Sequence, residues 1–292
     1  MSLTFSAGDL TIHRIIEQET TFLPALEMLP ALTPELLAEN RSWMRQTSAL
    51  DADDVLILCF QSYIVETPHH TILVDSCIGN DKPRPTRPKW NMKTDDTFLR
   101  GLAAAGFSPD DIDFVMCTHL HVDHVGWNTR LVDGRWVPTF PNARYVFAKH
   151  EFDYWTEQNA KTPVPPFGDS VLPVVEARRA EIVREDFQIG DHARILPTPG
   201  HTPGHAAFIF GKAKDHAVMS GDLMHSPLQA RYPELSMKFD VDQAQAAATR
   251  RNFLERYCDT DTLCCTAHFP SPSLGKIRRQ GDGFRCDGVA AN

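Results

Sequence analysis

The sequence predicts an α/β fold in which two β-sheets are covered by helices, and three observations lead to this prediction. Predicted strands dominate each half of the chain, predicted helices stand between them, and no segment has the composition of a linker between domains. The 292 residues are enough for one large domain with an ample buried core. We therefore predict a single domain over residues 1–292, with residues 1–50 as an N-terminal extension.

The first half of the chain predicts a hairpin, a helix and a short buried strand. Prolines at positions 24, 30 and 34 are expected to interrupt any long helix before residue 50. Residues 55–67 and 71–74 are rich in β-formers and predict the two strands of the hairpin. Residues 94–105 predict a helix, because Phe98 and Leu102 fall on one face and Gly106 follows. The apolar run 114–117 predicts the next strand.

The second half predicts short strands and one long helix. Strands are expected over residues 144–148, 194–197, 206–210, 217–220 and, as the last clear strand, 263–266. Helices are expected near residues 150–155 and over residues 241–257. The proline-rich segment 161–174 is predicted to be a loop over the functional site, with Phe167 touching a bound molecule.

Composition excludes several classes of protein. The net charge of −9 argues against a general nucleic-acid binder, which needs a basic surface. The longest apolar run, residues 55–60, is far too short to span a membrane, and the chain start lacks the apolar core of a signal peptide. The seven cysteines show no paired spacing and are expected to be reduced thiols. We therefore predict a cytoplasmic protein that binds neither nucleic acid nor membrane.

The most informative motif follows the strand 114–117 and reads H-x-H-x-D-H. It supplies four ligand-type side chains, which are His119, His121, Asp123 and His124. Imidazole and carboxylate together suit zinc and similar divalent metals. Alternate residues of an extended segment point the same way, so the first three can converge while His124 turns towards a second position. One segment can thus serve two adjacent metals. The alternative, a polar loop at a strand end, explains this spacing poorly.

At these residues the chain resembles the metallo-β-lactamase superfamily of hydrolases. Three later segments extend the resemblance in the same order, namely 198–205 (T-P-G-H-T-P-G-H), 220–222 (S-G-D) and 267–269 (A-H-F). The resemblance covers roughly residues 50 to 275. It implies a four-layer αββα sandwich of two mixed β-sheets flanked by helices.

The resemblance also implies a dinuclear site that holds two Zn²⁺ ions, for which Mn, Fe or Co are possible substitutes. It assigns His119, His121 and His201 to the first ion, Asp123, His124 and His268 to the second, and Asp222 to both. Such ions stand roughly 3.5–4 Å apart, and a water held between them becomes a hydroxide nucleophile near neutral pH. His205 opens a strand and is expected to orient its neighbours instead of binding metal.

The same resemblance narrows the reaction. The presence of both Asp123 and Asp222 favours the lactonases, thioesterases and phosphotriesterases of the superfamily. Residues 221–225 and 268–270 look most like those of the branch that holds methyl parathion hydrolase and related lactonases. We predict hydrolysis of a lactone or similar small ester. An organophosphate triester hydrolase and a mononuclear iron sulfur dioxygenase are the alternatives. The catalytic residues expected are Asp222, Asp123 and His225, which stands where related lactonases carry a tyrosine.

Three features leave their roles open. His225 is expected either to protonate the leaving alkoxide or to hold Asp222. The basic run at residues 82–89 either steers an anionic substrate or forms a solvated loop, and solvation is the commoner case. A homodimer built with the N-terminal region is one arrangement that the sequence leaves open.

Overall fold

The computed structural model describes residues 3–289 and divides the chain into two compact units. Within the described residues, the first unit holds 3–17 and 60–187, and the second holds 18–59 and 188–289. The chain passes between the units within two long strands, β2 (Leu10–Pro24) and β3 (Val55–Glu66). The prediction of a single domain stays a prediction. The predicted N-terminal extension contributes β2 to a sheet.

The first sheet is mixed and has seven strands in the order β1-β2-β3-β4-β5-β8-β9. Its remaining strands are β1 (Thr4–Ala7), β4 (Thr71–Val74), β5 (Phe114–Cys117), β8 (Arg144–Ala148) and β9 (Ala180–Val183). Strands β4, β5, β8 and β9 run parallel, whereas β3 pairs with β4 antiparallel. Because parallel strands end at the same edge, residues that follow β4 and β5 lie near one another.

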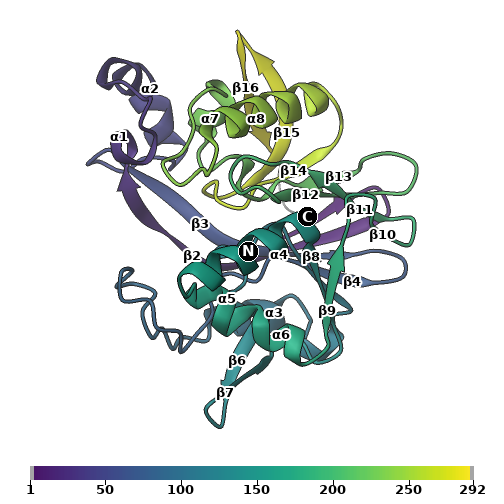
Figure 1. Ribbon diagram of the computed structural model, residues 1–292. Coiled ribbons are helices and arrows are strands. Elements are labelled where there is room, and N and C mark those ends of the chain that lie inside the picture. The colour runs from purple at the N-terminus through teal and green to yellow at the C-terminus, as the bar shows by residue number, and fades with distance from the viewer. Residues whose placement is uncertain (1–2, 290–292) are drawn as a thin grey trace. The chain divides into compact units, whose positions relative to one another are not determined.

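Helices and a hairpin complete the first unit (Figure 1). The helices are α3 (Thr97–Ala104), α4 (Lys149–Lys161), α5 (Pro165–Ser170) and α6 (Leu172–Glu176), and the hairpin is formed by β6 (Thr129–Val132) and β7 (Arg135–Pro138). Phe98 of α3 stacks on Trp127 with ring centroids 5.2 Å apart. Together with Phe147 of β8 they belong to the hydrophobic core of this unit. Burial of such rings is the main contribution to the stability of the unit.

The second sheet is also mixed, with seven strands in sequence order from β10 to β16. Its strands are β10 (Gln188–Ile189), β11 (Ala193–Pro197), β12 (Ala206–Phe210), β13 (Ala217–Met219), β14 (Leu263–Cys265), β15 (Leu274–Gln280) and β16 (Gly283–Gly288). Only the pair β13–β14 is parallel among the pairings described for this sheet. Asp222 and His268 follow these two parallel strands, so the two residues emerge at one edge.

Four α-helices belong to the described part of the second unit. They are α1 (Ala25–Met28), α2 (Pro34–Gln46), α7 (Pro227–Arg231) and α8 (Gln243–Tyr257). Phe253 and Leu254 of α8 pack with Ile277 of β15 in the core of this unit. The predicted fold class, α/β with two mixed sheets flanked by helices, is confirmed.

Three expectations about individual elements are wrong. Residues 161–174 are not a loop, because they end α4 and form α5 and most of α6, and Phe167 is 1% exposed in the core. Pro34 does not prevent a helix but begins α2, where Thr33 Oγ1 accepts the N–H of Leu36 at 3.2 Å. Proline suits this position since the first N–H groups of a helix have no intrahelical partner. The hairpin β15–β16 follows the strand that was expected to be the last.

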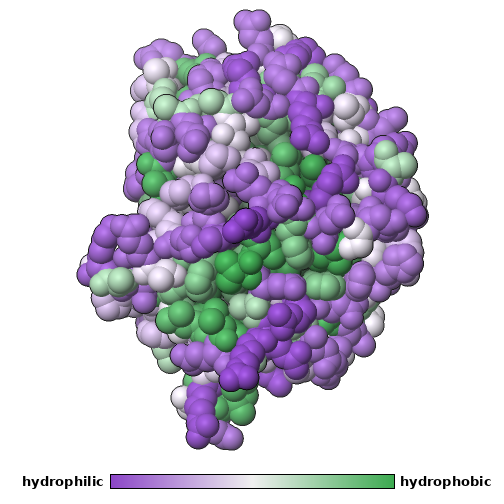
Figure 2. Space-filling model, turned by 45° about the vertical axis from the view of Figure 1, so that its right-hand side comes forward, coloured by the Kyte–Doolittle hydropathy of each residue, from purple (hydrophilic) through white to green (hydrophobic). Residues whose placement is uncertain are grey.

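On the face drawn in Figure 2, hydrophilic residues surround a hydrophobic area near the middle, and hydrophobic residues also lie at the lower tip. One such area is the tip of the β6–β7 hairpin, where Leu131 and Val132 are 41% and 42% exposed. Among the described residues, no helix has the length and apolar character needed to cross a membrane. All seven cysteines are free thiols.

Candidate metal centre

The loop after β5 carries the H-x-H-x-D-H motif, and Asp75 at the end of β4 fixes its shape. Asp75 Oδ1 accepts the backbone N–H of Thr118 at 2.8 Å, and Oδ2 lies 2.9 Å from His124 Nδ1. Asp75 has a positive φ of 57°, which turns its carboxylate out of the strand path. The parallel pairing of β4 with β5 therefore places a carboxylate behind the motif.

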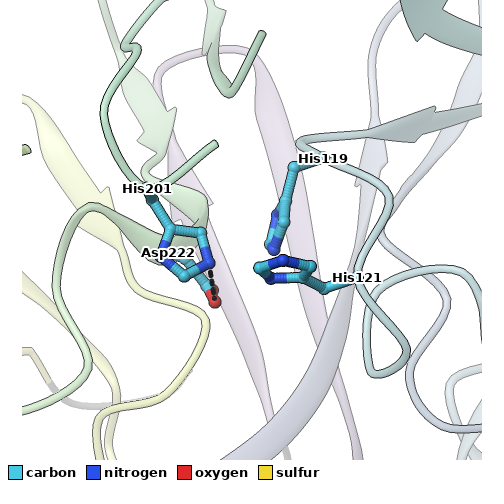
Figure 3. A group of neighbouring side chains, drawn as sticks. All are labelled: His119, His121, His201 and Asp222. Atoms are coloured by element: carbon cyan, nitrogen blue, oxygen red, sulfur yellow. Dashed lines mark ion pairs between the residues drawn. The ribbon is translucent and has the colours of Figure 1, made fainter. Parts of the chain in front are cut away.

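The imidazoles of this loop lie against one another. His119 meets His121 edge to face at 4.5 Å between ring centroids (Figure 3) and His124 at 4.1 Å. His119 and His124 are buried, whereas His121 and Asp123 are half-buried. Imidazoles this close to one another are typical of a metal site.

Helix α4 supports the same loop through Glu151. One oxygen, Oε1, accepts the backbone N–H of Leu120 at 3.0 Å and the indole N–H of Trp155 at 2.6 Å. The Trp155 ring in turn meets His121 edge to face at 5.4 Å. A single buried carboxylate thus holds the backbone between His119 and His121 and the ring beside His121.

In the second unit, three imidazoles converge on the carboxylate of Asp222. His201 Nε2 and His225 Nε2 lie 3.2 Å and 3.0 Å from Oδ2, and His268 Nε2 lies 3.0 Å from Oδ1. Figure 3 marks the first of these contacts. All four residues are at most 3% exposed. A carboxylate with both oxygens facing ligand-type nitrogens is suited to bridging two ions.

The other nitrogens of the predicted ligands are held by the protein. His201 Nδ1 lies 2.8 Å from Asp240 Oδ1, and His268 Nδ1 lies 2.8 Å from the carbonyl oxygen of Cys59. With the pair His124–Asp75, three imidazoles thus have Nδ1 occupied, which leaves Nε2 to bind a metal. This donor set fits zinc or a similar divalent ion.

His205 has the positioning role expected for it. Its Nε2 accepts the backbone N–H of Asp222 at 2.9 Å, while Nδ1 lies 2.8 Å from Thr198 Oγ1. The imidazole therefore fixes the backbone of Asp222. This contact leaves the carboxylate to His201, His225 and His268.

Burial and the neighbouring carboxylates shift the pKa values of His201 and His225 in opposite directions. Burial lowers the pKa of His201, but hydrogen bonds and charge from Asp222 and Asp240 outweigh burial and raise this pKa to about 9. Burial also lowers the pKa of His225, and Asp222 only partly offsets the effect. The two carboxylates stabilise positive charge at His201. In the absence of an ion that charge is a proton, and a divalent cation bound to the deprotonated imidazole would be stabilised by the same carboxylates.

Sequence reasoning found the ligand-type residues but missed the groups behind them. The structure gathers His119, His121 and His124 within the first unit, and His201, Asp222, His225 and His268 within the second. Asp75, Glu151 and Asp240 were not predicted. A signal existed only for Asp75, because it ends the strand that neighbours β5.

The match to a family model establishes the class of protein. The model described as the metallo-beta-lactamase superfamily matches residues 61–268. This match spans most of the chain, and it includes both the H-x-H-x-D-H loop and the residues around Asp222. The chain therefore belongs to the metallo-β-lactamase superfamily.

Curated relatives of the chain include lactonases. An N-acyl homoserine lactonase from Bacillus sp is 27% identical in an alignment 184 residues long, which covers 59% of this chain and 66% of the relative. The N-acyl homoserine lactonase AttM of Agrobacterium fabrum (strain C58) is 31% identical in an alignment 117 residues long, which covers 37% of this chain and 39% of the relative. The chain thus spans slightly less than two thirds of the first relative's length.

Solved structures share the fold over nearly the whole chain. The hydrolase AbOPH of the beta lactamase superfamily superposes with a TM-score of 0.82 at 22% identity, covering 99% of this chain and 97% of its own. The dizinc quorum-quenching lactonase AidC, in complex with a product, gives 0.77 at 22% identity and covers 99% and 98%. At this identity the likeness shows a common fold.

Proposed function

We propose that this protein is a dinuclear zinc-dependent hydrolase of a lactone or similar small ester. The observation that carries the proposal is the convergence of three imidazole Nε2 atoms on both oxygens of Asp222. Membership of the superfamily supports metal-dependent hydrolysis. The lactonase relatives favour a lactone over a phosphotriester as substrate.

The proposed ligand sets follow the family pattern. His119, His121 and His201 would hold one ion, Asp123, His124 and His268 would hold the other, and Asp222 would contact both. When bound, the ions supply Lewis acidity, which lowers the pKa of bound water and polarises a carbonyl oxygen.

The chain's own residues orient this centre. Asp75 and Asp240 hold His124 and His201 with Nε2 outward, and His205 fixes the Asp222 backbone. His225 contacts Asp222 Oδ2, so it can hold the carboxylate in place. Its second proposed role, proton donation to the leaving alkoxide, requires this imidazole to reach the substrate instead.

The test combines metal analysis with a substrate screen. Protein of measured metal content is assayed on lactones, aryl esters, thioesters and phosphotriesters. We expect two zinc ions per chain and the highest kcat/KM on lactones or esters. Asp222→Ala should reduce activity by orders of magnitude, whereas Asp153→Ala on the exposed face of α4 should not.

Two outcomes would overturn the proposal. One iron per chain with oxidation of a thiol substrate would identify a sulfur dioxygenase, and full activity in Asp222→Ala would exclude the dinuclear mechanism. A preference for phosphotriesters would keep the metal centre and change only the substrate. The cytoplasmic location and the homodimer remain predictions, which cell fractionation and light scattering test.

A further inference from the structure

The second unit contains a pocket of 460 Å³ that no step of the proposed reaction uses. It is lined by side chains from α2, α7, the segment after β14, and the hairpin β15–β16. Its apolar wall includes Trp43, Pro227, Phe269, Pro272 and Phe284. We call it the hairpin pocket. Its volume falls in the range of about 300–1,000 Å³ that is typical of small-molecule sites.

One charged group in this apolar wall has no protein partner. Arg231, the last residue of α7, lines the pocket and makes no hydrogen bond or ion pair through its side chain within residues 3–289. The other lining arginine, Arg285, is paired with Asp287 at 2.6 Å. The net charge offered to a bound molecule is therefore positive. A guanidinium beside aromatic and proline side chains suits a carboxylate with an apolar body.

The walls of the hairpin pocket are continuous with the Asp222 cluster. Pro227 and Arg231 stand one turn apart on α7, which begins directly after His225 and Ser226. Phe269 follows His268 in the chain. The rings of His225 and His268 are stacked, with centroids 5.2 Å apart and planes 12° from parallel. Each of the two segments that line the pocket is therefore adjacent in sequence to an imidazole, His225 or His268, that contacts the carboxylate of Asp222.

We propose that the hairpin pocket binds an apolar carboxylate, paired with Arg231, and that its occupancy alters metal affinity at Asp222. A molecule wedged between α7 and residues 269–272 shifts His225 and His268 relative to each other. Ester and lactone hydrolysis release carboxylates. This step rests on the proposed function: if the protein hydrolyses esters or lactones, the ligands of the pocket include its own carboxylate product. Binding of the product in the hairpin pocket would then regulate metal affinity at Asp222.

Binding is tested first on metal-free protein, so that the result does not depend on hydrolysis. Octanoate and uncharged 1-octanol are titrated by calorimetry. We expect one octanoate site per chain. Arg231→Met should weaken octanoate binding about 10-fold or more and leave 1-octanol unchanged, whereas Arg231→Lys should retain most of the affinity. Arg135→Met, at an exposed arginine on β7 outside the pocket, is the matched control.

Two further measurements complete the test. Thr47→Trp places bulk at the exposed rim and should weaken both ligands. Octanoate should change the zinc dissociation constant by the same factor by which zinc changes that of octanoate, because coupling is reciprocal. Equal octanoate affinity in native protein and folded Arg231→Met would overturn the site. Binding with an unchanged zinc affinity would overturn the coupling, and neither result depends on whether the protein hydrolyses lactones.

Discussion

At the scale of single residues, the chemistry of the site depends on what holds the far nitrogen of each imidazole. His124 and His201 face the carboxylates of Asp75 and Asp240, whereas His268 faces the neutral carbonyl of Cys59. A carboxylate partner makes an imidazole a stronger donor to a metal than a carbonyl does. The imidazoles proposed to bind the two ions therefore differ in donor strength, although the sequence shows each of them only as a histidine.

The first prediction concerns Asp240. Asp240→Asn keeps every proposed ligand but removes the charge behind His201, so zinc affinity should fall about 10–100-fold. Competition with a chromogenic chelator measures this change. Asp133→Asn, in the exposed turn of the β6–β7 hairpin, is the control and should bind zinc normally. An unchanged zinc affinity in Asp240→Asn would show that the pair His201–Asp240 does not support metal binding.

The second prediction separates the two roles of His225. Its Nε2 lies 3.0 Å from Asp222 Oδ2, which favours the role of holding the carboxylate. His225→Ala should then reduce kcat/KM by a similar factor for esters with good and poor leaving groups, and should weaken zinc binding. His69→Ala, at an exposed histidine, provides the comparison. A loss confined to poor alkoxide leaving groups would instead identify a proton donor.

At the scale of elements, strand ends were predictable and the proline-rich helices were not. The expected strands 71–74, 114–117, 144–148 and 206–210 agree with β4, β5, β8 and β12. Short apolar runs between polar residues suffice to locate buried strands. The prediction for segment 161–174 was wrong because three of its four prolines, Pro165, Pro166 and Pro173, occupy first-turn positions of α5 and α6, where proline is compatible with a helix. Proline content alone therefore predicts a loop, because it does not show whether a proline stands in the first turn of a helix or in its interior.

The third prediction corrects the role of Phe167. Its ring is 1% exposed and lies 5.6 Å from the ring of Phe152. Phe167→Ala should therefore lower the free energy of unfolding by about 3–5 kcal/mol. The ranking of substrates should stay the same. Ile182→Ala, at a side chain 40% exposed, should cost much less in a urea titration. A changed ranking of substrates at unchanged stability would instead support contact between Phe167 and the bound substrate.

The basic run 82–89 also anchors the fold, since Lys82 and Arg84 are buried beside Asp169. Lys82 Nζ lies 3.6 Å from Asp169 Oδ1 and 3.8 Å from the centroid of the Trp136 ring, and Arg84 makes two hydrogen bonds to the same carboxylate. Neither interpretation of this run, steering or solvation, describes these two residues. The spacing of charges in a loop does not show which of them face inward.

The fourth prediction follows from the burial of Lys82. Burial lowers its pKa to about 8, although Asp169 opposes this shift. The unfolded chain, with a lysine pKa of about 10.4, binds more protons between these values. The stability contributed through this group should therefore rise as the pH increases from about 8 to about 10.4. The difference in unfolding free energy between native protein and Lys82→Met should vary over this range, and a constant difference would contradict the assignment.

At the scale of the whole molecule, the sequence points to the candidate ligands but not to the framework that holds their side chains. Motif spacing is local, so His119, His121 and Asp222 could be identified without knowing the fold. Partners such as Asp240 and Glu151 lie 39 and 31 residues from the groups they hold, and their contacts depend on long-range pairing. The N-terminal strand β2 and the hairpin β15–β16 also escaped prediction, although β2 pairs with β1 and β15 pairs with β16, which are neighbours in the sequence.

The last prediction links metal binding to stability. An ion that binds only the folded chain stabilises it by RT ln(1 + [L]/Kd), about 2.7 kcal/mol when zinc is at 100 times its Kd. The thermal midpoint should therefore rise with zinc concentration and fall on chelation. His119→Ala in the first unit and Asp222→Ala in the second should each reduce this rise, since the proposed centre takes ligands from both. Asp153→Ala should retain it. If Asp222→Ala removes the zinc response and His119→Ala preserves all of it, the ions are held by the second unit alone and the proposed ligand sets are wrong.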